Sequence, residues 1–514
     1  MNASAYGMEM GGPGADAGRF ARLIDRIEKR PTEAFAAFAI LHLALWTLVP
    51  TLLCRNLPLD VLEGIAYGQH WQWGYWKHPP MPWLLDDLVR RMTAPHIWGF
   101  FLLGQVAAVA CFWAIWRLGC EILRPVEALA ATLLLDGCVT FNVATFEVNH
   151  NIIQLPFFGL AGWSLYRAFV GAKTLDWVLV GVWFAFAFYA KYTAATLLLP
   201  VLLFSIVDPT ARRCWSGPGV YIAMAIFAAL MAPHVIWLVG SDFSPIRFAN
   251  EKATEVAGLA SLVSSTAGFI GNALARDICT LLMFWIMLGR WWTLPNPVPP
   301  AERFAQRYLA VLAFGPLVIS VAGGVLLQRH FTAGWASQFW CFTGLFLVAQ
   351  WRPRIDAAAL RRLVLAWSAF TLLMVASQVG AQAFLIGRGS LMSPQFPGAE
   401  FAAAVTAAWH KETGQPLSYV IGDDFEAGTV VLFSPDPVVA YHEANHDYMP
   451  WIDEVDIRRR GAVLLWVSKD PRRPADFAAF AQAQPREPFV MRQPTLRGDL
   501  VWTIQWALLP PAGP

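Results

Sequence analysis

Two carboxylates lie close together in a polar, aromatic-rich segment near the start of the chain. Asp60 and Glu63 stand within residues 57–83, LPLDVLEGIAYGQHWQWGYWKHPPMPW. Because residues three positions apart share one face of a helix, the two side chains are predicted to point the same way. Such a pair can act as a general base with its orienting partner, or it can bind a cation. The alternative is a pair of solvated acids that cap a helix, which the tryptophans around them disfavour.

Two groups that can carry a positive charge end the same segment. Lys77 and His78 directly precede two prolines at 79–80, and proline is well tolerated at the start of a helix. Both side chains are therefore predicted at a helix amino terminus, where free N–H groups and the helix dipole favour an anion such as phosphate. A turn with a purely structural role is the alternative.

The aromatic residues between these groups allow two interpretations. Trp73 and Tyr75 belong to a dense run of rings. They can anchor the loop at the depth of the lipid headgroups, as aromatic belts do. They can also form a platform for sugar rings and a prenyl chain.

A second polar group interrupts the apolar sequence at 145–151, TFEVNHN. Glu147, Asn149 and His150 lie there between two apolar spans, with almost no room for a solvated linker. These side chains are therefore predicted to line a cavity.

Further charged and ring side chains follow at or between the apolar spans. Lys191 and Tyr192 interrupt an apolar hairpin, His234 lies at the outer end of a later span, and Arg247 and Arg329 lie in outer loops. Because an unpaired ammonium group is costly inside a membrane, Lys191 is predicted to face a carboxylate or a lipid phosphate. A lysine that extends its amine to the membrane surface is the alternative.

The cysteines and histidines indicate neither a disulfide framework nor a metal site. All seven cysteines lie in or beside apolar spans, as small buried side chains do. The histidines lack the i, i+4 or H-E-x-x-H spacing of a zinc site. The sequence therefore predicts no metal and no required cofactor, with a divalent cation as the alternative.

These residues belong to a chain dominated by apolar side chains. Of its 514 residues 57% are hydrophobic and 14% are charged, against about 25% charged in a typical soluble protein. The net charge of +2 provides no basic surface for a nucleic acid. Runs of about 20 apolar residues predict a polytopic α-helical membrane protein with about eleven transmembrane helices, near 34–53, 98–116, 126–144, 151–170, 175–190, 193–207, 219–239, 271–289, 308–327, 333–350 and 363–386.

The distribution of Lys and Arg predicts the orientation of these spans. Basic residues concentrate in the loops that the span count assigns to the cytoplasm, as the positive-inside rule requires. Residues 1–33 are then an amphipathic cytoplasmic segment, and residues 34–386 form the transmembrane domain that carries the site. Its outer loop 54–97 is predicted to lie on the outer face of the membrane, and the family resemblance given below implies that this is the periplasmic face of a bacterial inner membrane.

The composition changes at about residue 387 to one typical of soluble domains. With an odd number of spans, residues 387–514 lie outside and are predicted to form a small periplasmic α/β domain. Strands are expected over 417–422, 438–444, 462–467 and 500–508, and helices over 398–411, 424–433, 453–460 and 474–483.

The motifs above, taken in order, resemble those of a known family. L-D-x-x-E, W-x-W-G-Y-x-K-H-P-P-x-P, F-E-V-N-H-N, Y-A-K-Y and P-H-V-I-W-L are similar to motifs of the glycosyltransferase family 39-like membrane proteins. These are relatives of the protein O-mannosyltransferases and of the aminoarabinose transferases that modify lipid A, all of the GT-C architecture. The resemblance covers most of the chain, is strongest over 57–83 and 187–200, and is weak in the C-terminal domain.

The resemblance implies a transferase that moves one sugar from a polyprenyl-phosphate carrier to an acceptor hydroxyl in a single inverting displacement. Asp60 matches the family's catalytic acid and would be the general base, while Lys191 matches a lysine near the carrier phosphate. Many relatives have adjacent Asp and Glu, so the spacing here leaves the role of Glu63 open. His78 stands where the aminoarabinose transferases have a lysine, which would make the charge there pH-dependent.

The resemblance also implies the partners and the remaining site residues. Positive charge should stabilise the departing phosphate, and its expected sources are Lys77, His78, Lys191 and Arg247. The expected partners are the donor lipid, the bilayer and an acceptor that is lipid A or lipopolysaccharide, another glycolipid, a glycan or a protein. The second loop acid of the relatives has no single match here, because Glu147 and Asn149 both fit its position. The expected lining of the substrate cavity is Trp73, Tyr75, Glu147, Asn149, His150, Tyr192, His234 and Arg329.

Two other classes stay open from the sequence. An oligosaccharide ligase or polymerase of the same architecture would differ only in its donor. A lipid or sugar transporter would be expected to have inverted repeats and helices broken by Gly or Pro at matching positions, and the sequence contains no such repeats.

Overall fold

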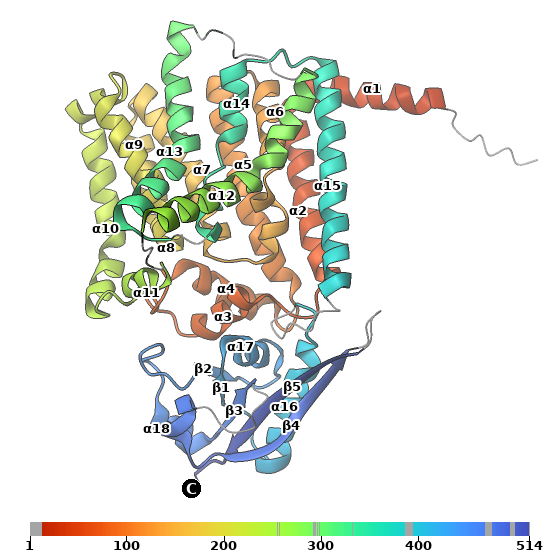
Figure 1. Ribbon diagram of the computed structural model, residues 1–514, viewed down its shortest axis with the longest axis vertical. Coiled ribbons are helices and arrows are strands. Elements are labelled where there is room, and N and C mark those ends of the chain that lie inside the picture. The colour runs from red at the N-terminus through yellow and green to blue at the C-terminus, as the bar shows by residue number, and fades with distance from the viewer. Residues whose placement is uncertain are drawn as a thin grey trace, which may run out of the picture.

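The molecule is a bundle of long helices with a smaller α/β domain at one end (Figure 1). Two short helices, α3 (Leu59–Gly68) and α4 (Met81–Thr93), lie between the bundle and this domain, and α1 (Pro13–Lys29) projects sideways at the opposite end. The computed structural model describes residues 13–253, 255, 258–290, 295, 297, 299–330, 333–385, 394–467, 475–493 and 499–512.

The bundle is made of the apolar segments of the sequence, and every predicted span overlaps one of its helices. A short outer helix, α11 (Ser244–Lys252), lies beside it. The helices that overlap the predicted spans are α2 (Pro31–Leu53), α5 (Trp98–Ile122), α6 (Pro125–Leu135), α7 (His150–Gly171), α8 (Thr174–Ala190), α9 (Ala195–Val207), α10 (Gly219–Gly240), α12 (Leu259–Leu288), α13 (Arg303–Leu327), α14 (Thr343–Trp351) and α15 (Ala357–Leu385).

The predicted class, a polytopic helical membrane protein with a small C-terminal α/β domain, is confirmed, but the count of about eleven spans is not. In the described part of the chain, six helices are long and apolar enough to cross a membrane: α2, α5, α10, α12, α13 and α15. A seventh would be α6 together with residues 139–146, a pair bent by 86°. Helices α8, α9 and α14 have 17, 13 and 9 residues, short of the roughly 20 that a straight span needs.

The bend after α6 is stabilised by one side chain. Asn142 donates its amide hydrogens to the carbonyl groups of Asp136, over 2.8 Å, and Cys138, over 3.1 Å. The bond to Asp136 satisfies a backbone acceptor at the break in an apolar environment, and the Cys138 carbonyl also accepts from the Phe141 N–H over 3.0 Å. The bend matters for the site because the chain leaves it directly into the loop that carries Asn149.

The C-terminal domain is a five-stranded mixed sheet with helices α16 (Gly398–Thr413), α17 (Asp424–Phe433) and α18 (Glu454–Arg460). The strand order is β2-β1-β3-β5-β4. β1 pairs in parallel with β2 and β3, whereas β5 pairs antiparallel with β3 and β4. The four predicted strands are all present; the bounds are β1 (Tyr419–Gly422), β2 (Val439–His442), β3 (Ala462–Trp466), β4 (Gln484–Gln493) and β5 (Leu500–Leu509).

One strand was not predicted. The helix expected over 474–483 is present only as a short 3-10 stretch, Ala475–Phe480, and the chain then enters β4. The sequence of β4, QPREPFVMRQ, contains two prolines and three charged residues. Such a sequence is tolerated in an edge strand, which pairs on one side only, and β4 lies at the edge of the sheet.

The α/β domain packs against the outer loop of the bundle through α3. Helix α17 lies directly against α3, and Gly428 of α17 is so close to the Leu62 carbonyl group that a Cβ there would collide with it. The side-chain amide of Gln69 donates to the Val438 carbonyl over 2.7 Å and accepts from the Ala440 N–H over 3.1 Å. This amide thereby pairs with the outer edge of β2 and fixes the domain to the loop.

We expect Gln69→Ala to loosen this attachment. The two lost hydrogen bonds are each worth about 0.5–1.5 kcal/mol, so amide exchange in residues 438–442 should become faster by about an order of magnitude in hydrogen-exchange mass spectrometry. Gln72→Ala is the control, because the Gln72 side chain makes no hydrogen bond among the described residues. Equal rates of amide exchange in β2 of both variants would show that Gln69 does not fix the domain to the loop.

Candidate active site

Asp60 lies in the first turn of α3 and is held by a residue from the second outer loop. The amide of Asn149 donates to Oδ2 of Asp60 over 3.0 Å. Asn149 is in turn the N-cap of α7, and its Oδ1 accepts from the Asn151 N–H over 2.9 Å. Of the two loop residues that could match the second acid of the relatives, Glu147 and Asn149, it is Asn149 that contacts Asp60. Glu147 lies nearby: burial, and then the Asp60 charge, raise the pKa of Glu147 to about 7.

Lys191 lies at the break between α8 and α9, where its extended backbone ends the first helix. Its Nζ donates to Oδ1 of Asn151 over 2.6 Å, and its carbonyl accepts from Gln154 over 2.7 Å. The side chain is buried, and Asp60 is close enough to attract it. Asp60, Asn149, Asn151 and Lys191 thus form a polar row with a carboxylate at one end and an ammonium group at the other.

The charge of Lys191 stays available to a ligand. No carboxylate forms an ion pair with Lys191 among the residues that the structure describes. Its hydrogen-bond partner, the Asn151 oxygen, is neutral. An anion bound beside it would therefore supply the countercharge that a buried ammonium group needs.

Glu63 and Lys77 form a buried ion pair, with side-chain exposures of 6% and 17%. Burial disfavours the charged form of Lys77, but the carboxylates of Glu63 and Asp424 outweigh this effect and raise the pKa of Lys77. The positive charge of Lys77 is therefore engaged by groups of the protein itself. Its predicted role as a phosphate ligand stays a prediction.

Breaking this pair should be costly. We expect Lys77→Met to lower the free energy of unfolding by about 3–5 kcal/mol, because Glu63 would keep a buried charge without a partner. The Glu63→Gln, Lys77→Met double variant should recover most of the loss, as measured by thermal unfolding of the full chain in detergent. If Lys77→Met is as stable as the double variant, Glu63 and Lys77 do not form a charged pair.

The rings of His78 and His150 contact each other, with centroids 4.0 Å apart and planes tilted by 36°. His150 Nε2 lies 3.3 Å from the Pro79 carbonyl, and α4 begins just after the two prolines, as predicted. Burial, and then His150 and the lysines 191 and 77, lower the pKa of His78 well below its ordinary value. This burial favours the neutral form of the His78 imidazole, which can donate or accept a hydrogen bond.

Tyr192, His234 and the outer loop are also brought together. Tyr192 Oη lies 3.0 Å from His234 Nε2, and His234 Nδ1 lies 2.6 Å from the Trp73 carbonyl. The ring of Trp73 is 57% exposed, as a substrate platform or a membrane anchor would be. Tyr75 differs from the prediction: it is fully buried between Tyr67, Trp83 and Trp451, and so packs the interior instead of lining an open cavity.

Arg247 and Arg329 are paired with neighbouring outer residues. Arg247 forms an ion pair with Asp242. Arg329 forms one with Glu255 over 3.0 Å and donates to the Ala253 carbonyl over 3.0 Å. Neither arginine contacts the polar row in this structure, so their predicted roles stay predictions.

A cavity of about 440 Å³ borders the polar row. Asn149 and Asn151 of the row line it, together with Glu147. Arg276 of α12 lines it as well, and sequence reasoning missed this residue. The signal that could have found it is a full charge inside an apolar span, which is a functional candidate by default.

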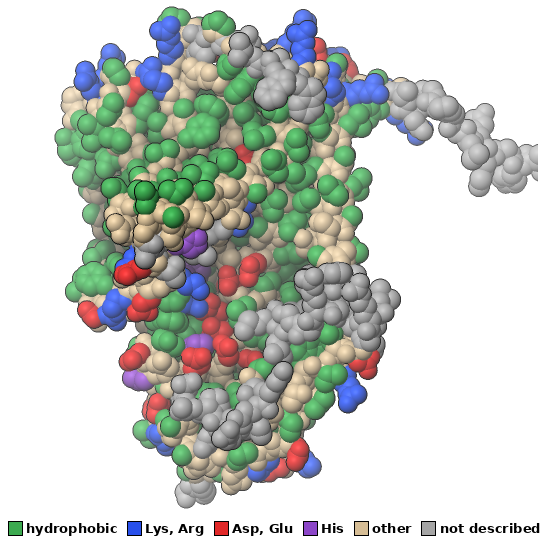
Figure 2. Space-filling model, viewed as in Figure 1, with side chains coloured by type: hydrophobic (Ala, Val, Ile, Leu, Met, Phe, Trp, Pro, Cys, Tyr) green, Lys and Arg blue, Asp and Glu red, His purple; other side chains and the backbone are tan. Residues whose placement is uncertain are grey.

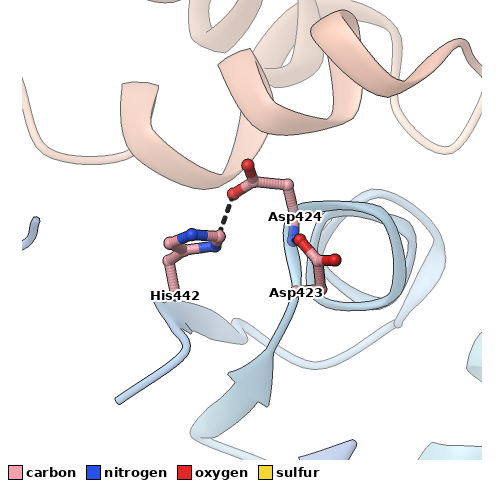
Figure 3. A group of neighbouring side chains, drawn as sticks. All are labelled: Asp423, Asp424 and His442. Atoms are coloured by element: carbon pink, nitrogen blue, oxygen red, sulfur yellow. Dashed lines mark hydrogen bonds and ion pairs between the residues drawn. The ribbon is translucent and has the colours of Figure 1, made fainter. Parts of the chain in front are cut away.

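Acidic side chains gather where the bundle meets the α/β domain (Figure 2). Asp424 and His442 point toward each other there, with Asp423 beside them (Figure 3), and the ligand atoms of the three residues lie within 4.8 Å of one another. Such oxygen and nitrogen atoms could hold one divalent cation. His442 Nδ1 lies 2.8 Å from Asp424 Oδ1. Burial alone would lower the pKa of His442, but the Asp424 carboxylate outweighs burial and raises this pKa. The charges of His442 and Asp424 therefore compensate each other.

Comparison with known proteins gives three findings. A family model described as dolichyl-phosphate-mannose-protein mannosyltransferase matches residues 77–237. The lipopolysaccharide core galacturonosyltransferase RgtA of Rhizobium johnstonii is 22% identical over 465 residues, which are 86% of this chain and 87% of that protein.

The fold is similar to that of ArnT from Cupriavidus metallidurans. The structure bound to undecaprenyl phosphate matches with a TM-score of 0.59 and 11% identity, covering 94% of this chain and 99% of that one. The apo structure matches with a TM-score of 0.57 and 12% identity, covering 94% and 100%. Together, the family model, the relative that matches along most of the chain and the shared fold show that this membrane protein is similar to glycosyltransferases of the GT-C architecture.

Proposed function

We propose that this protein transfers a single sugar, with inversion, from a polyprenyl-phosphate donor to a hydroxyl group of lipopolysaccharide, lipid A or a similar acceptor. The observation that carries the proposal is the polar row from Asp60 to Lys191. It offers a base and a cation in one site, bordered by a cavity.

The two ends of the row have complementary tasks in this reaction. Asp60 accepts the proton of the acceptor hydroxyl while the hydroxyl oxygen forms a bond to C1 of the sugar. The bond from C1 to the phosphate oxygen breaks, and the electron pair leaves with the polyprenyl phosphate. The protonated Asp60 then returns its proton to water. Asn149 keeps the carboxylate in position through its hydrogen bond.

Lys191 stabilises the negative charge that develops on the departing phosphate, and preorganised charges of this kind are worth several kcal/mol in a dry site. His78 adds a neutral hydrogen-bond donor beside it. A phosphate ester is already a good leaving group, so the reaction depends less on a general acid than a glycosidase that expels an alkoxide. The displacement needs no cofactor.

The relatives support the choice of substrates. The curated relative is named for transfer to the lipopolysaccharide core, and the similar structure was determined with undecaprenyl phosphate. A long-chain polyprenyl phosphate as carrier and an envelope glycolipid as acceptor are the pair that these names favour.

The distribution of charge supports a periplasmic site. Figure 2 shows Lys and Arg side chains along the rim of the bundle that lies farthest from the α/β domain. Under the positive-inside rule this rim faces the cytoplasm. The outer loop, the polar row and residues 387–514 then face the periplasm.

Mass spectrometry of envelope lipids from cells with and without the gene tests the proposal. We expect one acceptor species to lose the mass of a single sugar residue when the gene is absent, and to regain it on complementation. Loss of an oligosaccharide block would indicate a ligase instead. Identical lipid and glycan profiles would contradict the proposed function.

A further inference from the structure

The feature behind the inference is an arginine of the bundle that lines the cavity beside the polar row. Arg276 lies on α12, a helix long and apolar enough to span a membrane. Within the part of the chain that the structure describes, its guanidinium makes no hydrogen bond and no ion pair. Two arginines of other helices have acidic partners: Arg167 pairs with Asp176 over 3.0 Å, and Arg307 with Asp208 over 2.7 Å. A charge without a partner at such a place is costly unless a ligand supplies the countercharge.

The acids nearest to Arg276 in sequence and space do not supply it. Asp277, the next residue, is buried and forms no ion pair with Arg276 among the described residues. Glu147 lines the same cavity but forms no ion pair with Arg276 among the described residues, and burial, followed by the Asp60 charge, raises the pKa of Glu147 to about 7. The cavity therefore keeps a positive group that the protein does not neutralise.

The place of Arg276 relative to the polar row suggests what it binds. Its cavity is also lined by Asn149 and Asn151, which join Asp60 to Lys191. The volume of about 440 Å³ lies within the range of small-ligand sites, about 300–1,000 Å³. Polar side chains of two further segments, Ser337 and Gln378, complete the wall. A substrate that reacts at Asp60 can thus extend a negatively charged group toward Arg276.

We propose that Arg276 binds an anionic group of the reacting substrate and makes the enzyme selective for acidic substrates. The guanidinium fits a carboxylate or a phosphate through two parallel hydrogen bonds. The group is either the carboxylate of a transferred uronic acid or a phosphate of the acceptor glycolipid. This inference rests on the proposed function, in which Lys191 serves the carrier phosphate, so that Arg276 is free for a second anion.

Matched substrates separate the two sources. The full chain in nanodiscs is assayed with polyprenyl-phosphate-linked galacturonic acid and galactose, which differ only at C6, and with intact or dephosphorylated lipopolysaccharide core as acceptor. We expect Arg276→Gln to lower kcat/KM for the acidic substrate by about 10- to 100-fold, as the loss of hydrogen bonds to a charged group does, with little effect on its neutral counterpart. Arg276→Lys should retain part of the preference. Arg290→Gln, at an exposed arginine beyond the end of the same helix, is the control.

Each result supports or overturns the inference. A lost preference for the acidic donor, with an unchanged KM for the acceptor, identifies the sugar carboxylate as the ligand. A lost preference for the phosphorylated acceptor, with an unchanged donor ratio, identifies the acceptor phosphate. The inference would be overturned if the Arg276→Gln variant kept the donor and acceptor preferences of the unsubstituted protein.

A binding measurement separates this inference from the proposed function. Affinities for the same donors and acceptors are measured in the Asp60→Asn background, with and without Arg276→Gln, where no transfer is needed. If the unsubstituted protein transfers no sugar but Arg276→Gln still weakens binding of the acidic ligand, the proposed reaction fails and the anion site stands. Unchanged binding of every ligand removes the anion site, whatever the transfer assay gives.

Discussion

Replacement of Asp60 by asparagine is expected to stop sugar transfer while leaving the donor bound. The Asp60→Asn side chain has the same shape and can keep its contact with Asn149, but it cannot accept a proton at neutral pH. A positioned general base contributes about 10²- to 10⁴-fold to a reaction rate. We therefore expect kcat to fall by that factor in a reconstituted assay, with the Kd for the donor changed less than about threefold.

Asp447→Asn is the matched control, because Asp447 is an exposed carboxylate of the α/β domain on the same side of the molecule. It should turn over at the rate of the unsubstituted protein. Normal turnover of the Asp60→Asn protein would remove Asp60 as the base. A loss of donor binding together with activity would make Asp60 a binding residue instead.

Replacement of Lys191 by alanine is expected to have the second largest effect. Its ammonium group is the charge of the polar row that no carboxylate of the described chain neutralises. Loss of one preorganised donor at a developing negative charge costs about 10²- to 10³-fold in rate. We expect kcat/KM to fall by that factor, with a clear rise in the Kd for the polyprenyl-phosphate donor.

Lys173→Ala provides the control for Lys191. Lys173 is the exposed N-cap of α8, the same helix that Lys191 ends, so the two variants remove the same charge from opposite ends of one helix. Lys173→Ala should bind and turn over the donor normally. Equal donor affinities in the two variants would contradict a phosphate site at Lys191.

The sequence predicted most elements of the fold because their signals are local. The runs of apolar residues became helices of the bundle, and four β-rich segments became strands. The count of about eleven spans is not confirmed, because α6 bends sharply near residue 139 and α9 is too short for a straight span. β4 was missed because an edge strand tolerates proline and charge, so its sequence lacks the apolar alternation of a buried strand.

The sequence predicted residues of the candidate site but not the contacts between them. Asp60 and Asn149 are 89 residues apart and meet only through tertiary packing, so the sequence could not choose between Glu147 and Asn149. Lys77 was expected to face a phosphate, but it pairs with Glu63, a partner across the same loop.

One site residue was missed and one was misplaced. Tyr75 was expected on a cavity wall, and it is buried because the α/β domain adds Trp451 to its surroundings. Arg276 carried a visible signal, a charge within an apolar span. Its proximity to the polar row could be recognised only in three dimensions, because α12 and the second outer loop are far apart in the sequence.

The most direct test of the account is the mass of the acceptor after incubation of the purified chain with a polyprenyl-phosphate-linked monosaccharide. The account predicts a gain of one sugar residue per acceptor, with release of an equal amount of polyprenyl phosphate, and no gain with the Asp60→Asn variant. An acceptor of unchanged mass, with the donor intact, would contradict it.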